Sequence, residues 1–591
     1  MNVFRIVVLF ALSALVMSVM PACSEPPTQP TISLRILHTS DIHGKLTGFN
    51  YFSARNDGQP GLVHAAAVIA KARAEQPNSI LIDNGDLIQG DPLADWAMEL
   101  AKQGEHPIIA ALNSLKYDVA NLGNHEFNYG LENLFSAYQH ANFHVISSNL
   151  EWTELAPAAL REKVQPWVML ARQVIDSEGV EQRVNIAIIG VVPPQIMQWD
   201  ANLLSDRVVA HDMREAAAER IQEARQAGAD IIIIAAHTGL PRANEMALNT
   251  EQVVDQLALL EHVDAIVFGH QHQVFPGANS YPHSTAVDDQ RGTIHGIPAT
   301  SPGYAGSHVG QIDLLLEHDG QQWQVVDFNV AALKSDVQQA DQALVETLNN
   351  VHSGTQAYVQ QPVGVSQQEL SYATARLEPS SGVQFVQRAQ LWYAKERMQL
   401  PQAYRDLPLL SAAAPFDAAA DALEPFTEIA KGSVSLGQIA DLYRYPNSLD
   451  VVKLNTQQLL DWLEASAEAF VADGDPELRW SWVNKAIPHY NFDSILGLNY
   501  HIAPDQAPGS RIRNLTYQGQ PLSRDQEFLI LVNSYRASGG GNMPHLNSDS
   551  IVLQSPDQLP DILRWYLNSF AEQGYPHAIE QHWSLCLADA C

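Results

Sequence analysis

The sequence predicts an N-terminal α/β domain, a helical linker and a second, α+β domain. Short β-rich runs alternate with helical stretches over residues 32–329, an alternation typical of α/β domains. The polar stretch 334–358 is compatible with a helix, and β-like runs recur beyond it at 498–502 and 528–532. A chain of 591 residues, 46% of them hydrophobic, is too long for one core. We therefore expect at least two globular domains.

Residues 1–23 are expected to form a secretory signal peptide. Arg5 precedes the apolar run 6–20, which has the length of a secretory core and is short for a membrane span. Residues 20–23, Met-Pro-Ala-Cys, are similar to a lipobox, so Cys23 is a candidate lipid anchor; cleavage with release and an uncleaved anchor are the alternatives. Residues 24–31 contain three prolines and predict an extended tether. The protein is expected in the periplasm, in contact with a membrane only through Cys23.

The net charge of the chain limits the classes of molecule that it is expected to bind. A formal net charge of −32 makes a nucleic-acid polymer an unsuitable partner, because such recognition depends on clustered Lys and Arg. Any chemistry on phosphate groups must therefore bring its own positive charge, and metal ions are the obvious source. Small molecules remain the expected partners, and we expect a monomer.

Four segments are expected after the tether. The first domain is expected at 32–333, the linker helix at 334–362, the second domain at 363–577 and a tail at 578–591. Within the first domain, residues 62–75 and 211–227 have the composition of helices. The tail carries Cys586 and Cys591, which an oxidising compartment would permit to pair.

Polar side chains follow five of the β-like runs in the first domain, at the point where each run ends. Ligands of open α/β sheets bind beyond the carboxyl ends of the strands, so these side chains can converge on one crevice. The candidate metal ligands at these ends are Asp41, His43, Asp86, Asn124, His237, His270 and His272.

The residue types fit a pair of divalent cations. Asp86 is the candidate bridging residue, because two carboxylate oxygens can hold two ions about 3.5–4 Å apart. We expect Asp41, His43 and His272 around one ion, and His237, His270 and the neutral amide of Asn124 around the other. A set of nitrogen and oxygen ligands without thiolates suits Zn, Mn, Co or Fe.

Single histidines carry little weight by themselves. The chain has 22 histidines, and most histidines that follow a strand are packed or lie on the surface. We interpret His38, His64, His144 and His262 in that way. His125 directly follows Asn124, and we predict that it stabilises charge on the phosphoryl oxygens or protonates the leaving oxygen; a supporting, non-catalytic histidine is the alternative.

The motifs resemble those of the calcineurin-like metallophosphoesterases. Asp-x-His, Gly-Asp, Gly-Asn-His-Glu, His and Gly-His-x-His occur in this order, from Asp41 to His272. The resemblance implies a four-layer α/β/β/α domain with a dimetal centre. Longer phrases, such as 83–90, 191–197 and 410–416, are similar to the branch of the 5'-nucleotidase family that acts on 2',3'-cyclic nucleotides and 3'-nucleotides. In that family a linker helix joins the catalytic domain to a C-terminal substrate domain.

Two departures separate the chain from the 5'-nucleotidase pattern. Asn128 stands where that branch has an Asp that partners the catalytic His; an amide can orient His125 but stabilises its cation less. Residues 411–416 lack the Arg that helps to hold a terminal phosphate. The resemblance further implies that Tyr445 and Tyr535 stack on the base, which would give broad base specificity because every base has a π-face.

The predicted reaction is the opening of 2',3'-cyclic nucleotides to 3'-nucleotides, followed by hydrolysis to nucleoside and phosphate. We expect two divalent ions to supply the hydroxide nucleophile and to stabilise charge. One alternative is a 5'-nucleotidase or nucleotide-sugar hydrolase with the same metals. The other is a surface lipoprotein that binds nucleotides or metal without catalysis.

Overall fold

The computed structural model describes residues 30–586 except 52–53, 57, 242–250, 279, 282–283, 399, 422, 446 and 476. The expected signal peptide, Cys23 and Cys591 lie outside the described residues. Cys586 is disulfide-bonded, but its partner is not among the described residues, so the pairing with Cys591 stays a prediction. No helix of the described part is both long and apolar enough to cross a membrane.

The N-terminal domain contains two large β-sheets. The seven-stranded sheet has, in spatial order, β19 (Trp323–Lys334), β18 (His308–His318), β1 (Thr31–Thr39), β4 (Ser79–Asp83), β5 (Val119–Asn121), β6 (His144–Ile146) and β8 (Val164–Gln165). The second sheet has β15 (Val287–Asp288), β16 (Thr293–Ile294), β17 (Ile297–Pro302), β13 (Ala265–Phe268), β12 (Ile231–Ala236), β10 (Glu181–Val191) and β9 (Trp167–Ile175), with β14 (Val274–Phe275) paired to β17.

The two sheets pack face to face, and helices cover their outer faces. Alternate side chains of β12 serve two cores: Ile233 lies in the core between the sheets, whereas Ile232 and Ile234 lie in the core under the helices. The outer face of the first sheet is covered by α1 (Leu62–Glu75), α2 (Pro92–Ala101), α3 (Pro107–Ser114) and α4 (Leu131–Tyr138). The second sheet is covered by α8 (Met213–Gln226) and α9 (Val254–Leu257). The predicted four-layer α/β/β/α fold is confirmed.

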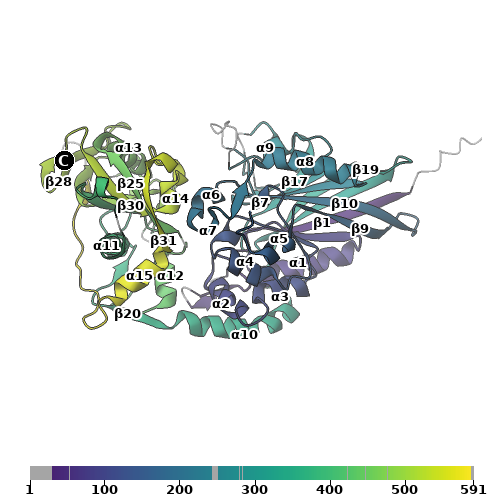
Figure 1. The fold of residues 1–591 in the computed structure, drawn as a ribbon, viewed down its shortest axis with the longest axis horizontal. Coiled ribbons are helices and arrows are strands. Elements are labelled where there is room, and N and C mark those ends of the chain that lie inside the picture. Colours follow the sequence, from purple (N-terminus) through teal and green to yellow (C-terminus); the bar gives the residue numbers. More distant parts are fainter. Residues whose placement is uncertain are drawn as a thin grey trace, which may run out of the picture.

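A single long helix, α10 (Gln342–Val359), connects the two domains (Figure 1). The Asp341 side chain caps its first turn by accepting a hydrogen bond from the Leu344 N–H. Gly354 allows close packing on α2, because a Cβ at that position would lie 2.4 Å from Trp96 Nε1. The helix begins later than the expected linker, since the chain continues as the edge strand β19 as far as Lys334.

The C-terminal domain is built around a mixed five-stranded sheet. Its strands, in spatial order, are β26 (Ser494–Leu496), β22 (Leu409–Ala413), β30 (Glu527–Asn533), β25 (Ser448–Asn455) and β31 (Ile551–Gln558). The main helices are α11 (Ser381–Arg397), α12 (Leu436–Leu442), α13 (Thr456–Ser466), α14 (Ser534–Ala537) and α15 (Leu559–Asn568). Separate hydrophobic cores lie on the two faces of this sheet.

A second, four-stranded sheet completes the C-terminal domain. Its order is β29 (Gln520–Pro521), β28 (Ile512–Tyr517), β27 (Leu498–Ile502) and β32 (Trp583–Leu585). The expected tail 578–591 therefore contributes a strand, because the buried Trp583 pairs with Tyr500 and anchors the end of the chain in the core. The fold class predicted for this domain, α+β, is confirmed.

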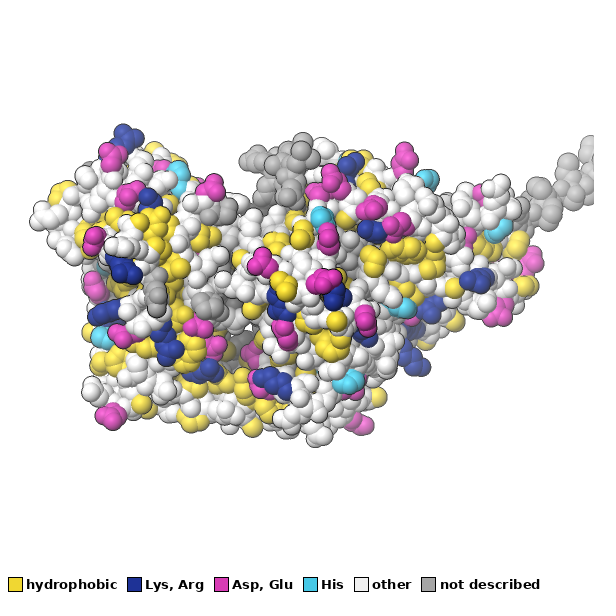
Figure 2. Space-filling view, viewed as in Figure 1, with side chains coloured by type: hydrophobic (Ala, Val, Ile, Leu, Met, Phe, Trp, Pro, Cys, Tyr) yellow, Lys and Arg dark blue, Asp and Glu magenta, His cyan; other side chains and the backbone are white. Residues whose placement is uncertain are grey.

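The surface shows no segregation of charge on the face in Figure 2. Lys and Arg side chains on this face are interspersed with Asp and Glu. Together with the net charge of −32, this distribution gives a polyanion no extended basic surface to bind there.

Candidate metal centre

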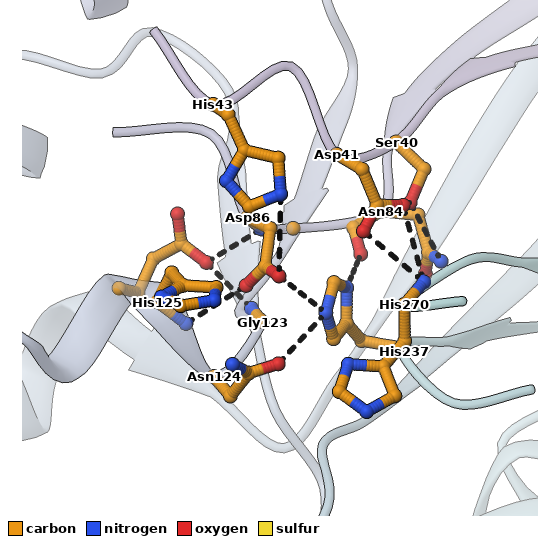
Figure 3. A network of polar contacts seen from close by, with 12 residues as sticks. Ser40, Asp41, His43, Asn84, Asp86, Gly123, Asn124, His125, His237 and His270 are labelled. Carbon is orange, nitrogen blue, oxygen red and sulfur yellow. Dashed lines mark hydrogen bonds and ion pairs between the residues drawn. The ribbon is translucent and has the colours of Figure 1, made fainter. Parts of the chain in front are cut away.

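The predicted ligands follow strands that run parallel within the two sheets. Strands β1, β4 and β5 run parallel in the first sheet, and β12 and β13 run parallel in the second. Their carboxyl ends meet at the same edge of the sandwich, and the side chains that follow them point toward one another (Figure 3). Seven side chains from five strand ends are thereby brought into one cluster.

One group of three ligands comes from the ends of β1 and β13. Donor atoms of Asp41, His43 and His272 all lie within 4.8 Å of one another. His43 Nε2 is 3.0 Å from His272 Nε2, and His272 Nε2 is 3.5 Å from Asp41 Oδ1. Two imidazole nitrogens that face each other beside a carboxylate are a suitable arrangement for a divalent cation.

The second group joins the ends of β4, β5, β12 and β13. Donor atoms of Asp86, His237 and His270 lie within 4.8 Å of one another, and Asn124 Oδ1 is 3.2 Å from His237 Nε2. Asp86 Oδ2 is 3.1 Å from His237 Nε2 and 3.8 Å from His43 Nε2. The same carboxylate oxygen is thus approached by a ligand from each group, which places Asp86 between the two groups, as expected of a bridging carboxylate.

The hydrogen bonds of two histidines prepare them for metal binding. His43 Nδ1 lies 2.9 Å from the Gln89 carbonyl oxygen, and His237 Nδ1 lies 2.7 Å from that of Asn84. A carbonyl only accepts, so Nδ1 carries a hydrogen in both rings, and Nε2 is the nitrogen that faces the cluster. The residues present therefore fit two divalent cations.

The pKa values of the ligands show that the cluster attracts positive charge. Burial lowers the pKa of His43 to about 3, which keeps its ring neutral. Burial also lowers the pKa of His237, but the Asp86 carboxylate outweighs it and raises this pKa to about 10. Conversely, burial raises the pKa of Asp86, but the charges of His237 and His125 outweigh it and hold this pKa well below its ordinary value. Asp86 thus stays ionised and attracts positive charge.

The backbone around the cluster is strained and tightly packed. Five of the seven predicted ligands have φ between 51° and 70°, a region that residues other than glycine rarely adopt: Asp41, His43, Asp86, His270 and His272. Gly123 allows two loops to approach, because a Cβ there would lie 2.4 Å from Asp86 Oδ1. Such strain persists where surrounding structure holds it, and it is concentrated at functional sites.

Several residues that hold the ligands carried no separate signal in the sequence analysis. The buried Glu126 carboxylate accepts hydrogen bonds from the N–H groups of Asp86 and Gly123, at 2.8 and 2.7 Å. Ser40 Oγ donates to Asp41 Oδ2 at 2.5 Å, and Glu251 Oε1 lies 2.5 Å from His270 Nε2. Glu126 belongs to the Gly-Asn-His-Glu motif, which could have identified it. Glu251 has no such motif.

His125 lies beside the two groups of ligands. Its ring centroid is 5.2 Å from that of His43, and its backbone N–H donates to Asp86 Oδ1 at 2.8 Å. Its Nδ1 is 2.6 Å from Asn128 Oδ1. The ring is therefore held through Nδ1 by Asn128.

The two predicted stacking residues belong to the C-terminal domain and are half exposed. Tyr445 is 41% and Tyr535 is 40% exposed. Burial raises the pKa of Tyr445, as do the hydroxyls of Tyr490 and of Tyr304, a residue of the N-terminal domain. Burial likewise raises the pKa of Tyr535, and Glu251 raises it further. Tyr304 stacks on His272 and Glu251 contacts His270, so the N-terminal neighbours of the two tyrosines belong to the metal-binding edge.

Two other aromatic residues near Tyr445 in sequence are now distinguished. Phe492 is 1% exposed and packs on Phe470 and Trp583, so it is a core residue. Tyr490 is 38% exposed and is a neighbour of both predicted stacking residues.

The histidines left outside the cluster have ordinary surroundings. His38 is fully buried, and burial lowers its pKa to about 3. His64 is buried and accepts a hydrogen bond from the Gly61 N–H, whereas His144 and His262 are exposed.

The fold and the paired ligand groups define a metallophosphoesterase, and two family models match the chain. Residues 34–274 match the calcineurin-like phosphoesterases, and residues 359–548 match the 5'-nucleotidase C-terminal domain. The chain belongs to the 5'-nucleotidase family of calcineurin-like metallophosphoesterases, as predicted.

Curated relatives agree with this assignment. The chain is 37% identical over 584 residues to the 2',3'-cyclic-nucleotide 2'-phosphodiesterase/3'-nucleotidase of Salmonella typhimurium, covering 94% of this chain and 89% of the relative. It is 36% identical over 580 residues to the trifunctional nucleotide phosphoesterase protein YfkN of Bacillus subtilis. That match covers 94% of this chain but only 39% of the length of YfkN.

Solved structures share the fold. A crystal structure of the calcineurin-like phosphoesterase YfkN from Bacillus subtilis matches 56% of this chain and all of that chain, with a TM-score of 0.53 and 36% identity. The 5'-nucleotidase precursor of Thermus thermophilus matches 94% of this chain and 99% of that chain, with a TM-score of 0.59 and 19% identity. The second similarity extends over both domains and concerns the fold alone.

Proposed function

We propose that this protein hydrolyses 2',3'-cyclic nucleotides to 3'-nucleotides, and 3'-nucleotides to nucleoside and phosphate. The observation that carries the proposal is the sharing of Asp86 between two ligand groups that face exposed tyrosines of the other domain. The similarity to the Salmonella relative over nearly its whole length supports the choice of substrates.

The residue roles are part of the proposal. Asp41, His43, Asp86, Asn124, His237, His270 and His272 hold two divalent ions, which are Zn, Mn, Co or Fe. When bound, such ions lower the pKa of a water molecule and stabilise charge on phosphate. His125 is the catalytic imidazole, Asn128 orients it, and Tyr445 and Tyr535 bind the base.

The tyrosines are assigned to substrate binding, and His125 is assigned to proton transfer. The tyrosines hold the nucleoside so that its phosphate reaches the ligand cluster, since stacking fixes the base without reading its edge. Asn128 holds Nδ1 of His125, which leaves Nε2 to donate to a phosphoryl oxygen or to the departing ribose 2'-oxygen.

The arginines next to the stacking residues are paired with carboxylates, and this favours the proposed reaction over 5'-nucleotide hydrolysis. Arg444 pairs with Asp417 at 2.7 Å and with Asp441 at 2.8 Å. Arg536 pairs with the buried Asp493 at 2.9 Å. Both guanidinium groups are engaged by carboxylates, and residues 411–416 contain no Arg that could clamp a terminal 5'-phosphate.

The test compares initial rates on 2',3'-cyclic AMP, 3'-AMP and 5'-AMP while Zn, Mn or Co is titrated. We expect activity on the first two substrates to exceed that on 5'-AMP at least tenfold. His125→Asn should lower kcat on both without loss of metal, and His144→Asn, an exposed histidine, should leave kcat unchanged. A higher rate on 5'-AMP would make the protein a 5'-nucleotidase, and no phosphate release with any metal would leave only binding.

Location and assembly are also proposals. We propose export to the periplasm, with a lipid anchor at Cys23, and a monomeric enzyme with small-molecule substrates. Labelling with a radioactive fatty acid should mark the wild-type protein and not Cys23→Ala. Light scattering of the purified protein should give the mass of one chain.

A further inference from the structure

A buried carboxylate lies behind the Asn128 amide. Asp200 stands between the short helices α6 (Ile196–Trp199) and α7 (Ala201–Leu204) and is 9% exposed. Its Oδ1 accepts a hydrogen bond from Asn128 Nδ2 at 3.0 Å, and Asn128 Oδ1 is 2.6 Å from His125 Nδ1. Asp200, Asn128 and His125 therefore form a continuous chain of hydrogen bonds that ends at the metal-binding edge.

The chemistry of these three groups fixes the direction of every hydrogen bond. An amide has a donor end and an acceptor end, and it can turn over, whereas an ionised carboxylate only accepts. Asp200 therefore keeps Nδ2 of Asn128 toward itself and Oδ1 toward His125. Facing an acceptor, Nδ1 of His125 must carry the hydrogen.

The position of Asp200 is costly for the fold. Burial raises its pKa to about 6, although the Asn128 hydrogen bond lowers it. Its second oxygen, Oδ2, is buried without a hydrogen-bond partner in the described part of the chain. An ionised carboxylate in such a place destabilises the folded state, so packing alone does not explain it.

The C-terminal domain contacts both segments that carry this network, the Asn128 turn and helix α7. Gln558 Nε2 donates to the Asn128 carbonyl oxygen at 2.9 Å, and Asn202 Nδ2 donates to that of Ser555 at 2.5 Å. Figure 1 shows α6 and α7 at the junction of the domains, facing β31. The Gln558 hydrogen bond fixes the Asn128 backbone, and the orientation of the Asn128 amide is left to Asp200.

We propose that Asp200 is a positioning residue of the reaction, which orients His125 through the amide of Asn128. The proposal rests on the proposed role of His125. It explains how a chain with Asn at position 128 keeps a carboxylate in the network: the acid lies one hydrogen bond further away, on a different loop.

The test replaces Asp200 by Leu, which has a similar shape and no acceptor. We expect kcat on 2',3'-cyclic AMP to fall on the order of 10–100-fold, as is typical when the partner of a functional imidazole is lost, with KM within about twofold. The melting temperature should change little, because removal of the buried carboxylate offsets the loss of the acceptor of Asn128 Nδ2. Asn202→Ala, a change in the adjacent helix α7 whose side chain bonds Ser555 and no member of this network, should keep kcat within about twofold.

The decisive variant is Asn128→Asp combined with Asp200→Leu. A carboxylate at position 128 accepts from His125 with either oxygen and needs nothing to orient it, so kcat should recover to within a few-fold of the wild type. A purely structural role of Asp200 predicts no recovery. If the Leu variant does not fold, Asp200→Asn replaces it, and Asn128→Asp/Asp200→Asn replaces the double variant. We then expect a smaller loss of kcat in the single variant and the same recovery of kcat in the double variant.

The outcomes separate the two proposals. Wild-type protein without activity on 2',3'-cyclic AMP would refute the proposed function. An active wild type, an inactive His125→Asn variant and an Asp200→Leu variant with undiminished kcat would refute only the role of Asp200, as would a double variant no more active than Asp200→Leu.

Discussion

Replacing Glu126 by Gln tests how the bridging carboxylate is held in place. The Glu126 side chain accepts four backbone hydrogen bonds, from the N–H groups of Asp86 and Gly123 on one oxygen and of Leu87 and Ile88 on the other. In a Gln side chain, an NH₂ group replaces one oxygen. Whichever way the amide turns, two buried N–H groups lose their acceptor and face another donor.

The cost follows from these contacts. Each buried N–H group left unsatisfied costs about 1–3 kcal/mol, so two cost about 2–6 kcal/mol. Such a loss extends from within the ordinary range of point mutations, about 0.5–3 kcal/mol, to values that are exceptional. The destabilisation should be greatest in the loop of residues 84–88, which carries Asp86, and metal binding should weaken as well.

Denaturant unfolding combined with hydrogen exchange of peptides covering residues 84–88 measures the effect on the catalytic domain by itself. Glu99→Gln is the matched control, because Glu99 is exposed and its pair with Lys102 should contribute less than about 1 kcal/mol. If the free energy of unfolding of Glu126→Gln lies within about 1 kcal/mol of that of the control, and the loop exchanges its amide hydrogens at the same rate, the reasoning about Glu126 is wrong.

Two further predictions concern binding and pH. Tyr535→Ala should raise KM on 2',3'-cyclic AMP about 5–150-fold with little change in kcat, because stacking on one ring contributes about 1–3 kcal/mol; an unchanged KM in steady-state kinetics would place the base elsewhere. Burial raises the pKa of Asp83 to about 8, although a hydrogen bond from Thr39 lowers it. The protonated Asp83 carboxyl thus contributes fully to the stability of the fold below pH ~4, and this contribution is lost as the pH rises through about 8. Asp83→Asn should flatten the decline in unfolding free energy over that range, and an equal slope in both proteins would contradict this.

The sequence was sufficient for the strand ends and for the residue types that follow them. Hydrophobic runs such as 231–236 and 265–268 ended at His237 and at His270, and the structure has strands over both runs. Parallel strands place their ends at one edge of a sheet, so the meeting of the ligands could be expected without knowing the loops.

The sequence was not sufficient for contacts that depend on loop conformation. Asp200 lies 72 residues from Asn128, and Glu251 lies 19 residues from His270. Neither pair has a periodic spacing or a shared motif, because the loops that join them have no repeating geometry. The strand at the C-terminus was missed for a similar reason: β32 has three residues and is defined by its pairing with β27.

Anomalous diffraction from crystals grown with Mn²⁺ tests the central claim most directly. The account predicts two peaks, about 3.5–4 Å apart. One should lie among Asp41, His43 and His272, the other among His237, His270 and Asn124, with Asp86 touching both. A single ion, or ions bound only elsewhere on the protein, would contradict it.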